Sequence, residues 1–168
     1  NSICGIGTAC HEMSHVFGAS DFYDTNYEDN GEFEGTGYWD LMAAGSWNGD
    51  TDRPSHFNPY TKTQTFQWAT LQTITSDNTI TLYPAHSNSN SFYRLNTFTP
   101  GEYFLIENRQ KLGFDTSLPG DGMSTYHVHS LFNDNSQINN ITHPQRFYPV
   151  CASATQNPTS TLSSYGDI

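Results

Sequence analysis

The sequence contains very little positive charge. Only 6 of its 168 residues are Lys or Arg, against 17 Asp and Glu, which gives a formal net charge of −11 at pH 7. Such an acidic chain repels the phosphates of nucleic acid, so we expect no nucleic-acid partner. Long hydrophobic runs are missing as well. No stretch of about 18 apolar residues occurs, and the sequence therefore contains no candidate membrane span.

Cysteine is also scarce. Cys4, Cys10 and Cys151 are an odd number, so at least one thiol has no partner within the chain and no disulfide framework can be inferred. We expect Cys10 to be buried in a helix and to point away from the face of its neighbour His11. The few lysines and the many Asn, Ser and Thr residues favour a secreted or cell-surface protein. Aromatic residues make up 14% of the chain, which excludes a disordered protein.

The most informative segment is HEMSHVFGASD, from His11 to Asp21. On a helix, His11 and His15 lie one turn apart, so both imidazoles leave the same face and can bind one metal ion. Glu12 lies beside them and can take a proton from a water molecule at the metal. Gly18 favours a turn at the end of the helix, after which Asp21 can supply a third ligand. Three protein ligands with one open position are typical of a catalytic zinc site.

Other interpretations of these residues stay open. The HExxH motif is short, and two solvated histidines on a surface helix produce the same pattern. Asp21 can instead belong to a turn or, together with Asp24, to a calcium site. Residues 21–40 form an acidic loop without Lys or Arg. Crowded carboxylates suit a calcium site, but EF-hand spacing is absent, so a solvated acidic loop is an equal alternative. Its acidic residues are Asp21, Asp24, Glu28, Asp29, Glu32, Glu34 and Asp40.

Several segments in this order resemble the M6 family of immune inhibitor A-like peptidases, which are zinc peptidases of the metzincin type. The resemblance extends to about Val128 and, more loosely, from His143 to Ala152. The matching segments are HEMSHVFGASDFYDT (His11 to Thr25), GYWDLMAAGSWNG (Gly37 to Gly49), PSHFNPYTKTQ (Pro54 to Gln64), GEYFLIENRQKLGFD (Gly101 to Asp115) and LPGDGMSTYHV (Leu118 to Val128).

The resemblance implies a set of site residues. His11, His15 and Asp21 would bind zinc, and Glu12 would be the general base and acid. Met42 would be the methionine of the Met-turn, a tight bend beneath the metal. Its other interpretation is an ordinary core methionine that fills a gap.

Two features depart from the family pattern. His129 and Ser130 stand where the family usually has an acidic residue, which puts any role of that acid in doubt. Family catalytic domains also carry a substantial segment before the zinc helix, whereas here the motif begins at residue 11. We therefore expect a fragment or a processed piece that lacks the N-terminal part of the catalytic domain.

The predicted fold class is α+β. Residues 1–69 are expected to hold the zinc helix, which starts near Ile6 and ends near Phe17 or Gly18, then the acidic loop, the Met-turn and a second helix over 54–69. Residues 70–154 are expected to form a β-rich part of the same catalytic domain, and 155–168 a loose tail. The expected strands are 79–83, 92–95, 103–107 as a central strand, 123–129 and 146–152, with a polar loop over 130–142.

Two further pairs of residues and one single histidine each have two possible roles. His127 and His129 share a strand face and form either a second metal site or, as is commoner, a polar face. Glu107 and Arg109 either organise the cleft wall or pair within the sheet, which is the interpretation we favour. His56 either donates to an oxyanion or, as we favour, lies on the surface at the start of a helix.

Together these features predict a secreted zinc-dependent endopeptidase that acts on proteins or peptides, with Zn²⁺ and a further Ca²⁺ as candidate cofactors. The alternatives are a zinc-binding but inactive fragment and a β-rich surface-binding module. Cleavage specificity, the physiological substrate and the oligomeric state do not follow from the sequence.

Overall fold

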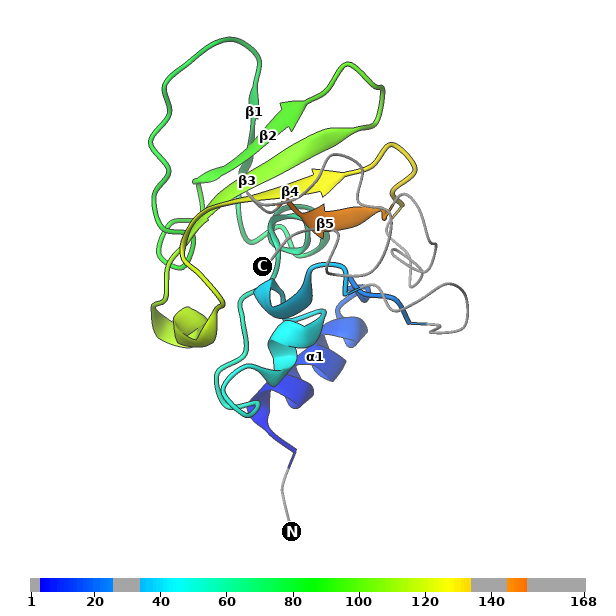
Figure 1. Cartoon of the computed structure of the whole chain (residues 1–168), viewed down its shortest axis with the longest axis vertical. Helices are drawn as coiled ribbons and strands as arrows, with labels where there is room; N and C mark the ends of the chain where they lie inside the picture. The colour runs from blue at the N-terminus through cyan, green and yellow to red at the C-terminus, as the bar shows by residue number, and fades with distance from the viewer. Residues whose placement is uncertain (1–3, 26–33, 134–144, 151–168) are drawn as a thin grey trace.

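The computed structural model describes residues 4–25, 34–133 and 145–150. In this part of the chain one α-helix and several short helical turns lie beside a five-stranded sheet (Figure 1). The predicted α+β class is confirmed. No helix among the described residues is both long and apolar enough to cross a bilayer.

Helix α1 spans Ile6–Val16, and its predicted start and end are confirmed. It ends at Phe17 in a Schellman motif, in which the Gly18 amide donates to the His15 carbonyl (3.0 Å) and the Ala19 amide to the Ser14 carbonyl (3.0 Å). Gly18 has φ = +93°, a conformation that L side chains rarely adopt. The glycine therefore lets the chain turn back towards the helix face that carries His15.

The sheet contains five strands in the order β1-β2-β3-β4-β5. Strands β1 and β2 are parallel, and all other neighbouring pairs are antiparallel, so the sheet is mixed and β3 is central, as predicted. The strands are β1 (Leu71–Ile74), β2 (Phe92–Asn96), β3 (Tyr103–Arg109), β4 (Gly122–Val128) and β5 (Phe147–Pro149).

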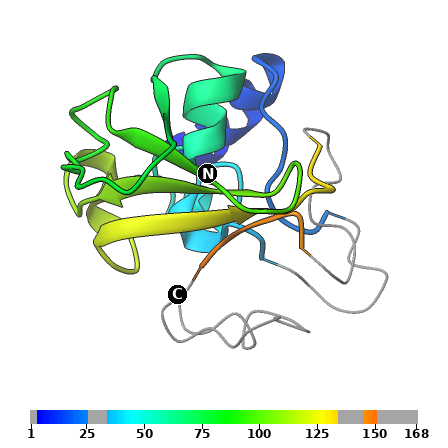
Figure 2. The ribbon, with the colours of Figure 1, turned by 90° about the horizontal axis from the view of Figure 1, so that it is seen from above.

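One face of the sheet carries the core. Side chains alternate between the two faces of a strand, and in β3 to β5 all the buried residues lie on one face. Figure 2 shows α1 and the helical segment near residue 60 on the same side of the sheet. The segment after α1 and the bend at residues 40–43 pack on this face through Phe22 and Met42. The buried core cluster consists of Ala19, Phe22, Met42, Leu105, Tyr126, Val128 and Phe147.

The predicted second helix over 54–69 is wrong in extent. Only a short helical segment that begins at Pro59 and continues as the π-helix Thr61–Thr65 forms there. The preceding backbone amides are taken by distant acceptors, since His56 N–H donates to Asp115 (2.8 Å) and Asn58 N–H to Asp40 (3.0 Å). These bonds hold the chain in a non-helical path up to Pro59, which then occupies the first turn as the proline rule requires.

The predicted strand over 79–83 does not form. Tyr83 N–H donates to the hydroxyl of Ser91 (2.8 Å), and the Leu82 carbonyl accepts from the side-chain amide of Asn108 (2.9 Å). Pro84 makes only an isolated bridge to Asn108 and has no N–H for a ladder. Residues 79–83 are therefore held beside β3 by hydrogen bonds to side chains and not by strand pairing.

Several other expectations have different outcomes. Cys10 is half-buried rather than buried, and it and the exposed Cys4 are free. Cys151, residues 26–33 of the acidic loop, most of the loop 130–142 and the tail 155–168 lie outside the described residues. The division at residue 69 stays a prediction.

A buried ionic cluster ties the sheet to the segments that lie under it. Arg109 donates to Glu107 (3.2 Å), to both oxygens of Asp115 (2.7 and 3.0 Å) and to the Trp39 carbonyl (2.8 Å). Lys62 donates to the other oxygen of Glu107 (2.9 Å). The pairing of Glu107 and Arg109 within the sheet is confirmed, and it joins three separate stretches of the chain.

This cluster makes the free energy of unfolding depend on pH. Burial raises the pKa of Asp115, but the charge and hydrogen bonds of Arg109 lower it by a larger amount. The net pKa of Asp115 therefore lies below its ordinary value. A carboxyl group whose pKa is depressed by folding stabilises the fold above its unfolded pKa of about 3.9, and this contribution is lost as the pH falls. We expect the free energy of unfolding in urea to drop less between pH 6 and pH 3 for Asp115→Asn than for the parent. Equal drops would contradict this assignment.

Candidate metal centre

The two histidines of α1 are held by backbone carbonyls on one side of each ring. His11 Nδ1 lies 2.8 Å from the Leu41 carbonyl oxygen, and His15 Nδ1 lies 2.8 Å from that of Ala19. A carbonyl oxygen can only accept, so in the neutral ring each Nδ1 carries the proton. Each Nε2 is left with a lone pair, and this arrangement is typical of metal-binding histidines.

Both Nε2 atoms point to a common place that Asp21 also reaches. The two nitrogens are 3.3 Å apart, and Asp21 Oδ1 lies 3.1 Å from His11 Nε2 and 3.4 Å from His15 Nε2. The three atoms thus form a nearly equilateral triangle. Two ligands about 2.0–2.1 Å from one ion at the tetrahedral angle are separated by about 3.3 Å, so the triangle has the size of one face of a tetrahedral zinc site.

The donor set also requires a positive charge at its centre. Asp21 Oδ1 is buried and has no hydrogen-bond partner among the described residues, although it lies near two imidazole nitrogens. With Nδ1 protonated, both neighbouring nitrogens are acceptors too, so three lone-pair atoms face one another. Burial lowers the pKa of His11, but the nearby carboxylate of Asp21 and the Leu41 carbonyl raise it more, and the net pKa is above its ordinary value. A proton or a metal ion relieves the repulsion, and the residues fit a divalent metal.

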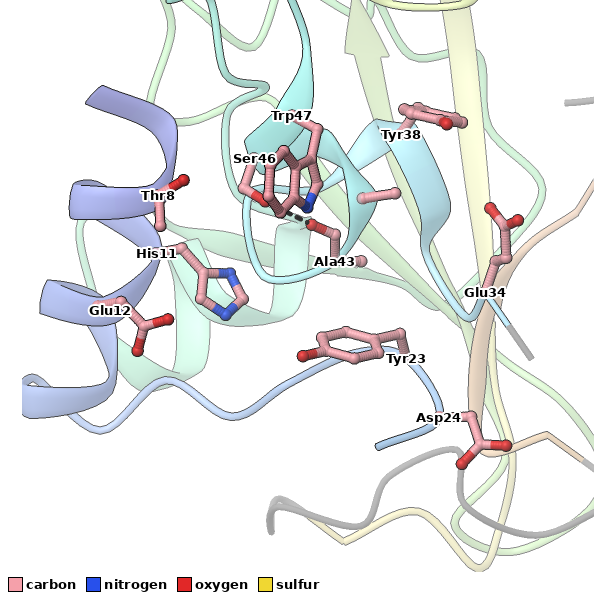
Figure 3. A pocket seen from close by; sticks show the side chains of 11 residues that line it. Thr8, His11, Glu12, Tyr23, Asp24, Glu34, Tyr38, Ala43, Ser46 and Trp47 are labelled. Carbon is pink, nitrogen blue, oxygen red and sulfur yellow. Dashed lines mark hydrogen bonds between the residues drawn. The ribbon is translucent and has the colours of Figure 1, made fainter. Parts of the chain in front are cut away.

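Glu12 lies beside this triangle, next to an open pocket. Its side chain is exposed and lines a cavity of about 380 Å³ together with His11. Figure 3 shows the Glu12 carboxylate next to the His11 imidazole, with the ring of Tyr23 and the indole of Trp47 forming other walls. The candidate base is therefore open to a water molecule and to a ligand in the pocket.

The bend at residues 40–43 supports the site from below. Met42 is fully buried in the core cluster, and its carbonyl accepts from the Phe22 amide (2.9 Å). This burial suits both interpretations of Met42. The adjacent Leu41 carbonyl is the acceptor for His11 Nδ1. The bend thus holds one histidine directly, and Asp21 through its neighbour Phe22.

Asp40 holds the shape of this bend. Its carboxylate accepts from the amides of Met42 (3.2 Å) and Asn58 (3.0 Å), from the Asn58 side chain (2.6 Å) and from the Thr36 hydroxyl (2.9 Å). Burial raises the pKa of Asp40, although each of these hydrogen bonds lowers it. All four partners are donors, so only a carboxylate satisfies them together.

We expect Asp40→Asn to weaken both the fold and the metal site. The new amide NH₂ faces donors, which leaves buried groups unsatisfied and lowers the free energy of unfolding by about 1–3 kcal/mol. Displacement of the Leu41 carbonyl should reduce zinc affinity by about 10–100-fold, as for other groups that orient a metal ligand. Competition with a fluorescent chelator measures this affinity. The exposed Asp52→Asn is the control, and unchanged affinity in folded Asp40→Asn would contradict the role.

The other candidate residues lie away from this centre. His56 is half-buried, burial lowers its pKa, and it is not among the described residues that line the pocket. His127 has both ring nitrogens engaged, with Glu102 (2.6 Å) and Tyr148 (2.8 Å). In the part of the chain that the structure describes, His11, His15 and Asp21 are the one group that could hold a metal. The polar-face interpretation of His127 and His129 is thus favoured.

Sequence reasoning missed some of the supporting residues. Nothing in the local pattern marks the Leu41 carbonyl as the partner of His11, because the two are 30 residues apart. In the sequence Asp40 is one acid of the acidic loop, whereas in the structure its carboxylate is fully buried under the bend. Asp24 and Glu34 line the pocket, and the calcium expectation for this loop stays a prediction.

Comparison with known proteins bears on the same region. A family model described as immune inhibitor A peptidase M6, catalytic domain, matches residues 2–72. The chain is also similar to the pre-pro-metalloprotease PrtV of Vibrio cholerae serotype O1, from strains M66-2 and ATCC 39315 / El Tor Inaba N16961, with 38% identity over 58 residues in each case. The similar stretch covers 33% of this chain and 6% of each relative. No solved structure matches the chain significantly.

These similarities place residues 2–72 beside known metallopeptidases. Residues 2–72 are similar to the catalytic domain of the M6 family, and this segment includes every residue of the candidate metal centre. The resemblance seen in the sequence is therefore confirmed. Because the chain spans only about 6% of the length of the relatives that it matches, its activity and substrates are matters for proposal.

Proposed function

We propose that this chain carries the catalytic metal centre of a zinc-dependent endopeptidase that hydrolyses peptide bonds in proteins. His11, His15 and Asp21 hold the ion, and Glu12 is the general base. The observation that carries the proposal is the triangle of three lone-pair atoms with sides of 3.1, 3.3 and 3.4 Å. The match of residues 2–72 to the M6 peptidase catalytic domain also supports the proposal.

A bound zinc ion supplies Lewis-acid chemistry, since it polarises a carbonyl oxygen and makes water acidic enough to react near neutral pH. The side chains of the protein transfer the proton. Glu12 accepts a proton from the attacking water and then delivers it to the nitrogen of the leaving amine. The water oxygen forms the new bond to the carbonyl carbon, and the carbon–nitrogen bond breaks.

The backbone carbonyls contribute by fixing the imidazoles. The Leu41 and Ala19 carbonyls keep both rings in the tautomer that presents Nε2, so no rearrangement is needed when the ion binds. The open pocket beside Glu12 leaves room for a substrate. A location outside the cell agrees with the composition and remains part of the proposal.

The decisive experiment combines elemental analysis with a cleavage assay. Purified protein is expected to contain one zinc ion per chain and to cleave casein, and 1,10-phenanthroline is expected to remove both properties, with recovery on addition of zinc. Stoichiometric zinc without cleavage would instead support a zinc-binding but inactive chain. Absence of bound zinc after incubation with the metal would contradict the proposed centre and favour a binding module.

A further inference from the structure

We propose that the pocket beside the metal centre selects a positively charged side chain, Lys or Arg, next to the scissile bond, and that Glu34 recognises its charge. The inference rests on the proposed peptidase function and names the class of substrate for the same site. Because His11 and Glu12 themselves line the pocket, a peptide that binds at the metal centre has room there for a side chain next to the bond that is cut.

The charges that line the pocket are negative. Among the described residues its lining includes three carboxylates, those of Glu12, Asp24 and Glu34, and no Lys or Arg. When zinc is bound, its two positive charges are balanced by Asp21 and Glu12, so the other two carboxylates add negative charge. The whole chain also has a formal net charge of −11. A cleft lined by one sign of charge concentrates ligands of the opposite sign, so this pocket favours a cation.

The backbone around Glu34 places its side chain at the pocket. The Thr36 amide donates to the Phe22 carbonyl (3.0 Å), which joins this stretch to the segment that carries Asp21. The Gly37 amide donates to the Glu34 carbonyl (2.8 Å) and closes a turn, in which Gly37 has φ = +54°. Glu34 itself is half-buried. Its carboxylate therefore lines the pocket from a segment that is fixed to the core.

The walls of the pocket suit the stem of a long cationic side chain. Figure 3 shows Glu12 on one side of the pocket and Glu34 on the opposite side, with Tyr38 and Trp47 among the side chains between them. Tyr38 is 49% and Trp47 65% exposed, so a ligand can reach their rings. Methylene groups pack on such rings, and the head group of Lys or Arg is attracted to their faces.

The size of the pocket also fits one side chain. Its volume of about 380 Å³ lies at the lower end of the range of about 300–1,000 Å³ that is usual for ligand pockets. Three small residues of the lining leave this space open, namely Ala43, Ala44 and Ser46. A Lys or Arg side chain can therefore lie along the aromatic rings and bring its charge to Glu34.

The test compares two peptides that differ in one charge. Arginine and citrulline have nearly the same size and shape, but citrulline is neutral. Mass spectrometry of the cleavage products of casein is expected to show Lys or Arg at one of the two positions that flank the cut. With Arg at that position, kcat/KM should exceed that of the citrulline peptide by about 10–100-fold, because the neutral side chain lacks the hydrogen bond between charged groups.

Glu34→Gln removes the charge from the pocket and keeps its shape. The ratio of kcat/KM for the two peptides should fall from about 10–100 to about one, with unchanged zinc content. Glu12→Gln, with and without Glu34→Gln, allows the binding of uncleaved peptide to be measured by calorimetry. The affinity for the Arg peptide should fall by a similar factor when Glu34 is changed. Trp47→Ala should weaken the binding of both peptides, because it removes a ring that contacts the stem.

Asp121→Asn is the control, because this exposed carboxylate does not line the pocket, and it should keep the preference of the parent. Equal cleavage of the two peptides by the parent, which needs no variant, would overturn the inference. The same follows if folded Glu34→Gln keeps the preference, or if calcium ions abolish it, which would make these carboxylates a calcium site. A parent protein that cleaves nothing in a chelator-sensitive manner contradicts the proposed function, whereas cleavage without a charge preference contradicts only this inference.

Discussion

Replacing His11 with alanine is expected to remove the metal from the purified protein. The change deletes one of three donor atoms that lie within 3.4 Å of one another, and it also deletes the bond to the Leu41 carbonyl that orients this donor. Zinc affinity should therefore fall by more than the about 10–100-fold typical of losing an orienting group alone. Mass spectrometry of the bound metal and competition with a chelator measure this loss.

The matched control for His11 is His86→Ala, because His86 is exposed and lies outside the centre. It should retain one zinc per chain. If His11→Ala also retained one zinc with the affinity of the parent, the ion would lie elsewhere and the centre described above would be wrong. The same measurement on Asp21→Ala tests the third ligand separately from the two histidines.

Replacing Glu12 with glutamine is expected to keep the metal and abolish most of the turnover. The side chain is exposed and is not part of the donor triangle, so zinc content should equal that of the parent. Glutamine has nearly the same shape but cannot accept a proton from water, which should lower kcat by about 10²–10⁴-fold. Hydrolysis of casein and of a fluorescent peptide gives kcat, and metal analysis of the same sample gives occupancy.

Asp77→Asn is the control for this change, since it removes an exposed carboxylate that does not line the pocket and should leave kcat unaltered. Glu12→Gln that cleaves casein at the parent rate would show that another group takes the proton. A variant that loses zinc together with activity would show instead that Glu12 helps to hold the ion.

The parts of the fold that were predicted correctly depend on short-range patterns. Helix α1 follows from the HExxH spacing and from the glycines near its two ends, signals that lie within a few residues of one another. The apolar run in β3 predicted a central strand for the same reason. The segments 54–69 and 79–83 carry similar patterns, but distant groups take their backbone amides, among them Asp40, Asp115 and Ser91.

The candidate site divides in the same way. Three donors, His11, His15 and Asp21, were named from eleven consecutive residues, because one helical turn and one glycine turn determine how their side chains can meet. The groups that orient them were not. The Leu41 carbonyl and the buried Asp40 reach the site from a bend some 30 residues later, and no local spacing encodes such a contact.

The sequence by itself determined the HExxH motif, the acidic and aromatic character of the chain, its resemblance to the M6 family and most of its strands. These properties depend on residue chemistry and on periodicities of two to four residues, which are present in the sequence whatever its tertiary structure. Only the tertiary structure decided that the donor atoms converge within 3.4 Å, that Asp40 holds the bend beneath them, and that Glu34 and Glu12 line one pocket. The physical reason is that each of these contacts joins segments brought together by burial of a common core, and burial is a property of the whole packed chain.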